Sequence, residues 1–162
     1  MTGTGYDVSL FLHITAVVIG LGSTFVEGLT FPVAMRLDPR HLPYKHRLQL
    51  AIHRFLTLPA PVVVLATGFY QVAELDADLG DVWLSGALAI VFVLAGLIGA
   101  YFIPEDRRLE AMVTRDIATS GSGAVTLSDE YRRRVRIEAA LGGFASLLVI
   151  AAVYLMVTKP RV

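Results

Sequence analysis

Apolar residues gather in four long stretches of the chain, which polar and charged segments separate. The stretches cover residues 8–35, 48–73, 82–103 and 137–158. Each is close to the ~20 residues that a helix needs to cross the hydrocarbon core of a bilayer. Strands of a membrane barrel would alternate apolar with polar residues, and helices of a soluble bundle would carry a wide polar face. Because the stretches do neither, the pattern predicts four transmembrane helices.

Short connections between the stretches make consecutive helices antiparallel neighbours. We therefore expect an all-α fold, a transmembrane up-down-up-down four-helix bundle, as one domain over residues 1–162. Residues 105–117 carry apolar side chains at helical spacing among charges, which predicts an extension of the third helix or an interfacial helix. Ser128 followed by Asp129 and Glu130 is typical of a helix start, so the fourth helix is expected to begin before the membrane.

The charged residues predict how the bundle is oriented. Nearly all Lys and Arg residues lie in the loops 36–47 and 104–136, whereas the acidic segment 74–81 has neither Lys nor Arg. Cytoplasmic loops of membrane proteins carry an excess of these basic residues. We therefore expect both basic loops in the cytoplasm and both termini outside. The formal net charge of zero conceals this asymmetry.

Composition and charge also limit the partners. The basic loops are expected to lie against anionic lipid headgroups, and because they lack interleaved aromatic residues, no nucleic-acid partner is expected. The chain has no cysteine, which excludes disulfides, thiolate metal sites and thiol redox chemistry. Small residues at helical spacing in the third and fourth stretches favour close helix packing, within the chain, in a homo-oligomer or in a larger membrane complex.

Two ionisable residues of the first stretch, His13 and Glu27, are expected inside the membrane. Gly20 lies midway between them, and because seven residues make nearly two helical turns, all three share one face. Ionisable groups in lipid are costly, so they face the bundle interior and are candidates for function. Alternatively, His13 is shallow enough to reach interfacial water. For Glu27 a structural or a proton-handling role is expected.

A partner for Glu27 follows from depth in the membrane. Glu27 and His53 lie at similar heights from the inner end of their helices, so an ion pair or hydrogen bond between them is feasible. Arg54 is adjacent and either extends to the cytoplasmic interface or joins the pair. This polar group would also suit a proton-coupled carrier.

His13 is also a candidate haem ligand. His13 and His53 lie near opposite faces of the membrane, so they are not expected to be the two axial ligands of one haem, and His46 is expected in a cytoplasmic loop. Met156 is the only soft ligand at the level of His13, which leaves a His/Met or a five-coordinate haem b open. A non-haem metal site is less expected there, because that side lacks a second imidazole or carboxylate.

Several short motifs resemble two related groups of proteins. They are residues 12–18 (Leu-His-Ile-Thr-Ala-Val-Val), residues 54–59 (Arg-Phe-Leu-Thr-Leu-Pro) with Gly68, Trp83, and residues 157–160 (Val-Thr-Lys-Pro). The chain resembles an uncharacterised family of predicted bacterial four-helix integral membrane proteins, which implies a multi-pass protein of the bacterial cytoplasmic (inner) membrane. It is more distantly similar to the HemJ-type protoporphyrinogen oxidases, which bind haem b.

The distant resemblance to the HemJ-type proteins implies that His13 is a haem ligand, but it does not extend to the third helix. His13 would correspond to the first-helix histidine that HemJ-type proteins use at haem, and Arg136-Ile-Glu138 loosely matches their Arg-x-x-Asn-Glu entry to the last helix. Their third helix is expected to carry a lysine and a histidine, and residues 82–103 contain neither. Porphyrinogen oxidation is therefore not expected.

Three functions follow as hypotheses. The first is a haem- or quinone-associated redox membrane protein, with His13, Gly20 and Met156 at the cofactor. The second is a non-catalytic accessory subunit of a larger membrane complex. The third is a proton-coupled carrier that uses Glu27 and His53, which four helices without an internal repeat make difficult unless the protein oligomerises.

Overall fold

The computed structural model describes residues 3–34, 36 and 38–160 of the chain. Within these residues, the regular elements are all helical. In chain order they are α1 (Thr4–Ala16), the π-helical η1 (Val17–Leu21), α2 (Ser23–Ala34), the 3-10 helix η2 (Pro39–His41), α3 (Leu42–Ile52), the π-helical η3 (His53–Thr57), α4 (Pro59–Glu74), α5 (Val82–Gly96), the π-helical η4 (Leu97–Phe102), α6 (Ile103–Ser120) and α7 (Asp129–Thr158).

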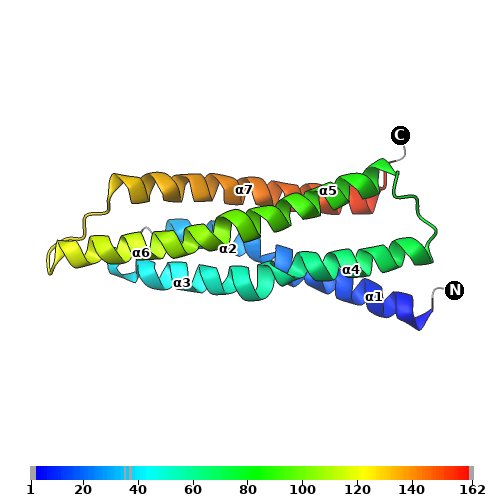
Figure 1. The fold of residues 1–162 in the computed structure, drawn as a ribbon, viewed down its shortest axis with the longest axis horizontal. Helices are drawn as coiled ribbons and strands as arrows, with labels where there is room; N and C mark the ends of the chain where they lie inside the picture. The colour runs from blue at the N-terminus through cyan, green and yellow to red at the C-terminus, as the bar shows by residue number, and fades with distance from the viewer. Residues whose placement is uncertain (1–2, 35, 37, 161–162) are drawn as a thin grey trace.

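These elements join into four long helices that form an elongated antiparallel bundle (Figure 1). The two chain ends lie at the same end of the bundle as the connection from α4 to α5. The connections from α2 to α3 and from α6 to α7 lie at the opposite end. The basic segments of the sequence are therefore gathered at one end, which we call the basic end.

The outer faces of the four long helices are apolar, as contact with lipid requires. All four are long and apolar enough to cross a membrane. One strongly exposed apolar side chain from each illustrates this: Leu29 (70%), Phe55 (76%), Phe92 (59%) and Val157 (76%). The predicted all-α fold with four membrane-spanning helices is thereby confirmed. Residue 35, the expected end of the first span, and residue 37 of the first loop lie outside the described residues.

Two apolar cores hold the bundle together. The first lies among η1, α4, α5, η4 and α7, and its buried members include Leu21, Leu94 and Ile98. The second lies at the basic end, where Leu109 and Tyr131 pack among α3, α6 and the start of α7. This second core exists because the helices continue well beyond the length that lipid needs.

The basic end contains helices where the sequence predicted loops. Helix α3 begins at Leu42, inside the segment expected as a loop, and α6 extends the third helix to Ser120 without a break. The expected extension over residues 105–117 is therefore confirmed. Helix α7 begins with Ser128 as its N-cap, whose hydroxyl accepts a hydrogen bond from the backbone N–H of Tyr131, also as expected.

Three of the four long helices contain a π-helical segment in the middle of the bundle. Segment η3 contacts both η1 and η4, so the wide turn of the second long helix meets those of the first and third. Pro59 follows η3 and has no backbone N–H to continue the regular ladder, which favours a wide turn before it. Such turns insert one extra residue and change the faces that later side chains present, and they are frequent at functional sites.

Candidate functional site

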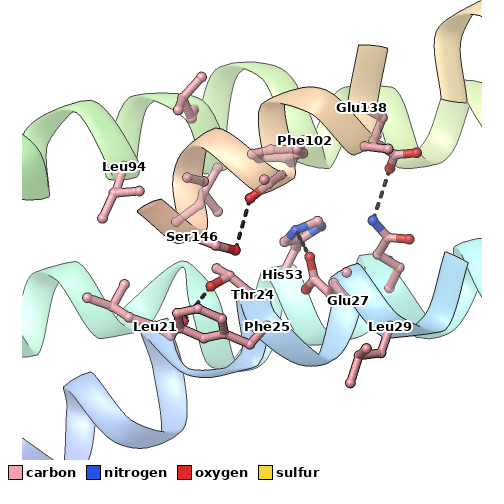
Figure 2. A pocket seen from close by; sticks show the side chains of 18 of the residues that line it. Leu21, Thr24, Phe25, Glu27, Leu29, His53, Leu94, Phe102, Glu138 and Ser146 are labelled. Atoms are coloured by element: carbon pink, nitrogen blue, oxygen red, sulfur yellow. Dashed lines mark hydrogen bonds and ion pairs between the residues drawn. The ribbon is translucent and has the colours of Figure 1, made fainter. Parts of the chain in front are cut away.

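A buried imidazole, His53, lies between two carboxylates at the centre of the bundle. Its Nδ1 atom is 2.6 Å from Oδ2 of Asp106, and its Nε2 atom is 2.9 Å from Oε2 of Glu27. His53 is 1% exposed and Asp106 is fully buried. Figure 2 shows His53 and Glu27 turned toward each other from neighbouring helices. The expected contact between Glu27 and His53 is confirmed, and Asp106 is a partner that the sequence did not indicate.

The surrounding helices fix the orientation of the His53 ring. His53 is the first residue of η3, and its carbonyl accepts the backbone N–H of Leu58, five residues later. The ring stacks on Phe102, the last residue of η4, with 5.3 Å between centroids and 23° between planes. Two π segments therefore hold the imidazole in one position between the carboxylates.

A second polar pair extends the cluster toward the basic end. The side-chain amide of Gln49 on α3 donates a hydrogen bond to Oε1 of Glu138 on α7, with 3.0 Å between the atoms, and both residues are buried. Lys45, one turn before Gln49, lies close enough to Glu138 to interact with its charge. Three carboxylates and two basic side chains thus share the interior of the bundle.

A cavity of about 380 Å³ adjoins this polar cluster. At one end it is lined by Glu27, Lys45, Gln49, His53 and Glu138, and its remaining wall is mostly apolar, with Leu21, Leu94 and Ala145 among the lining residues. Phe25 and Leu29 also line it and are 41% and 70% exposed, so the cavity reaches the outer surface of the bundle beside α2 (Figure 2).

Small residues of α7 leave room for this cavity. Gly142 and Gly143 line it, and a Cβ atom at either position would meet no other atom within 4 Å. Ala139 and Ser146 continue the same wall one turn before and one turn after. The small residues of the fourth helix therefore open a space in this structure, in addition to any packing they allow.

The other residues that the sequence singled out lie apart from this cluster. The ring of His13 accepts or donates a hydrogen bond at Nδ1, 2.9 Å from the hydroxyl of Thr67, and His13 and Met156 line one separate cavity of about 320 Å³. Gly20 is buried against Ala60 and does not line either cavity. The side chain of Arg54 is exposed. His13, Gly20 and Glu27 nevertheless all face the second long helix, through Thr67, Ala60 and His53 respectively.

Comparison with known proteins places the chain in a family. Residues 7–160 match the family model described as Predicted integral membrane protein (DUF2269). The chain belongs to this family. A search of the curated proteins and a search of the solved structures each give no match.

As a member of this family with four apolar helices, the protein is a multi-pass integral membrane protein. The family description assigns it a place in a membrane and no reaction. The groups of this chain that are arranged for chemistry are those of the buried cluster and the two cavities.

Sequence reasoning missed most of the polar cluster for one reason. Asp106, His46 and Gln49 lie close to the ends of the apolar stretches, where polar residues are expected to meet water. Because α3, α6 and α7 pack together at the basic end, these side chains are buried at 0%, 1% and 7% exposure. One signal was available: the apolar spacing of residues 105–117 predicts a helix with a face to bury, and Asp106 belongs to that helix.

Proposed function

We propose that this protein binds a quinone or quinol of the membrane in the 380 Å³ cavity and takes part in a redox process there. The observation that carries the proposal is that this cavity combines an apolar wall with one polar end. Its wall is mostly apolar, and its polar end holds Glu27, whose Oε1 atom is buried and has no hydrogen-bond partner in the described part of the chain. Ligand sites of this kind combine apolar walls with a few placed polar groups.

The chemistry of a quinol matches this arrangement. Its hydroxyl groups donate hydrogen bonds, and Oε1 of Glu27 is an acceptor without a donor, while Oε2 is held by His53. The ring and isoprenoid tail are apolar, and they would lie against Leu21, Leu94 and the glycines of α7. Entry from lipid beside Phe25 and Leu29 would spare the tail any contact with water.

The proposal is tested by titrating the detergent-purified protein with a short-tail ubiquinol and a short-tail menaquinol. Saturable binding to the wild type is expected. The Glu27→Gln variant should bind about 10- to 100-fold more weakly, because a hydrogen bond to a charged group contributes about 1.5–3 kcal/mol. Glu74→Gln, at an exposed position of α4, should bind like the wild type. Absence of binding to folded wild-type protein, or equal binding by Glu27→Gln, would contradict the proposal.

A second candidate is haem at His13, and one observation favours it. His13 and Met156 line the same cavity, and imidazole with thioether is a ligand pair that haem iron accepts. The hydroxyl of Thr67 holds Nδ1 of His13, which leaves Nε2 as the ligating atom. Bound haem would supply one-electron transfer. The purified protein should then show a Soret band that is lost in His13→Ala and kept in His41→Ala, and colourless folded protein would exclude this candidate.

A further inference from the structure

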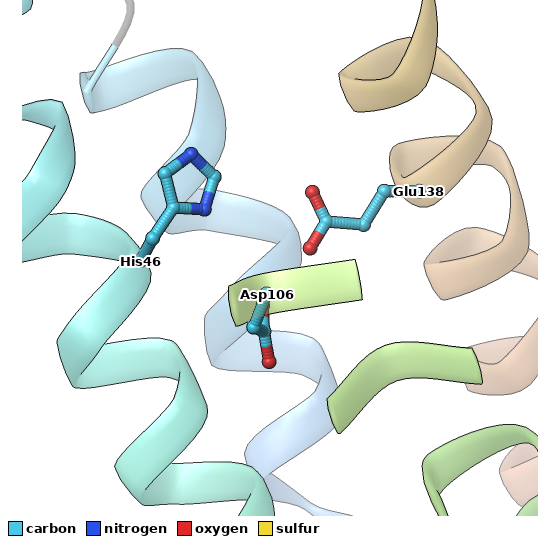
Figure 3. A group of neighbouring side chains, drawn as sticks. All are labelled: His46, Asp106 and Glu138. Atoms are coloured by element: carbon cyan, nitrogen blue, oxygen red, sulfur yellow. The ribbon is translucent and has the colours of Figure 1, made fainter. Parts of the chain in front are cut away.

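A second group of chemically active side chains lies beside the proposed quinone cavity, toward the basic end. His46 on α3, Asp106 on α6 and Glu138 on α7 each offer one ligand atom, and these atoms lie within 4.8 Å of one another. The three residues are 1%, 0% and 4% exposed. Figure 3 shows the three side chains converging from different helices. Their convergence is a product of the tertiary structure, since 92 residues separate His46 from Glu138 in the chain.

Two of these side chains each contain a buried polar atom that makes no hydrogen bond within the described residues. Nδ1 of His46 and Oδ1 of Asp106 are buried, and neither has a hydrogen-bond partner among the residues that the structure describes. Burying polar atoms without partners costs free energy, so native proteins rarely do so without a reason. Both unpaired atoms belong to the same cluster, so an ion bound between them would supply the partner that each lacks.

The other atoms of the same side chains are fixed by buried neighbours. Nε2 of His46 is 2.9 Å from the hydroxyl of Tyr131, and Oδ2 of Asp106 is 2.6 Å from Nδ1 of His53. Glu138 accepts a hydrogen bond from Gln49. Each candidate ligand therefore has a neighbour that orients it, which is the arrangement found around metal ions in proteins.

The charge of the region also favours a cation. Three carboxylates, from Glu27, Asp106 and Glu138, face two basic side chains, Lys45 and His53. With all three carboxylates ionised and both basic groups charged, the cluster carries one more negative than positive charge. Buried charges in proteins are paired or coordinate metal ions. A divalent ion would offset this excess without any change of the fold.

We propose that His46, Asp106 and Glu138 bind one divalent first-row transition metal ion. Nδ1 of His46, Oδ1 of Asp106 and a carboxylate oxygen of Glu138 would be the ligand atoms. Ions of this class lie about 2.0–2.2 Å from such atoms, so donors that lie within 4.8 Å of one another would have to approach by roughly 1 Å to close around one. A mixed set of imidazole and carboxylate suits Zn²⁺, Mn²⁺ and Fe²⁺, whereas Mg²⁺ and Ca²⁺ prefer oxygen ligands alone.

The experiment uses the full-length protein, purified in detergent and stripped with a chelator. Binding of Zn²⁺ and of Mn²⁺ is measured by calorimetry, and the bound metal is counted by mass spectrometry after gel filtration. One ion per chain is expected. His46→Ala and Glu138→Gln should each weaken binding by about 100-fold or more, since even loss of an orienting neighbour costs about 10- to 100-fold. His41→Ala, an exposed histidine of the same region, is the matched control and should bind like the wild type.

A milder variant guards against loss of the fold. Tyr131→Phe keeps the ring in the apolar core and removes only the hydroxyl that orients His46. It should weaken metal binding about 10- to 100-fold. In addition, Co²⁺ should give visible absorption bands with the wild type and not with His46→Ala. The proposal is overturned if the folded wild type binds none of these ions, or if it binds them equally well without His46.

This site does not depend on the quinone proposal, and one variant separates the two. Ser146→Leu places a larger side chain on the wall of the cavity, two helical turns away from the proposed ligand Glu138. It should therefore leave metal binding unchanged even where it abolishes quinol binding. Failure of metal binding in that variant alone would contradict the proposed positions of the ligands.

Discussion

At the scale of single residues, His53 organises the interior of the protein. It is nearly fully buried, and each ring nitrogen faces a carboxylate, one on α2 and one on α6. A buried ionic group of this kind is destabilising when one member is removed, because the remaining charges lose their partner. The imidazole therefore links the first, second and third long helices through two short contacts.

Replacement of His53 by alanine should destabilise the protein strongly. The variant would leave the carboxylates of Glu27 and Asp106 buried without a basic partner at these positions, which costs about 3–5 kcal/mol in similar cases. The free energy of unfolding in detergent micelles, measured by denaturant titration, provides the test. His41→Ala, at an exposed position, should change it by less than about 0.5 kcal/mol. Similar stability of the two variants would mean that the carboxylates find other partners.

At the scale of the elements, the π segments and one glycine set how closely the first two long helices approach. Gly20 lies in η1 against Ala60 of α4, and a Cβ atom on Gly20 would collide with Cβ of Ala60 and lie 3.1 Å from the carbonyl oxygen of Leu56. Small residues at such crossings let helix backbones pack closely in membranes. The depth at which Glu27 meets His53 depends on this contact.

Gly20→Ala should therefore destabilise the bundle, although alanine is the better helix former. Overpacking of a tight contact costs about 1–3 kcal/mol. Gly28→Ala is the matched control, because Gly28 lies in the same long helix and a Cβ atom there meets nothing within 4 Å. That variant should be neutral or stabilised by up to about 1 kcal/mol. Thermal unfolding of both variants compares the two positions directly, and equal melting temperatures would show that the helices can separate at little cost.

The elements also show how far sequence reasoning reaches. Hydropathy predicted the four spanning helices, the Ser128 cap was recognisable, and depth along two helices predicted the contact of Glu27 with His53. Asp106, His46 and Gln49 could not be assigned, because burial at the basic end depends on the packing of α3, α6 and α7. Pro59 favours the wide turn of η3, whereas the sequence alone did not locate the π segments η1 and η4.

In the molecule as a whole, charge is distributed unequally between the two ends of the bundle. The basic segments lie at one end, and the acidic connection of residues 75–81 lies at the other with both termini. By the distribution of basic residues, the basic end is expected in the cytoplasm. The polar cluster would then lie in the inner half of the membrane, with the second apolar core projecting beneath it.

The absence of cysteine allows a direct test of this orientation. Single cysteines introduced as Ala77→Cys and Ser122→Cys report the two opposite ends of the bundle. In intact cells, a maleimide that does not cross membranes should label Ala77→Cys and leave Ser122→Cys unlabelled until the cells are opened. The reverse pattern would invert the predicted topology, although the fold itself would stand.

Two leucine variants, one that fills the cavity between α2 and α7 and one that does not, test the proposed quinone site of this cavity. Gly142→Leu fills the cavity, whereas Gly96→Leu adds the same side chain on an exposed face of α5 that lines neither cavity. Quinol affinity should fall by at least about 10-fold in Gly142→Leu and stay at the wild-type value in Gly96→Leu. Equal affinity in both variants would contradict a quinone site in this cavity.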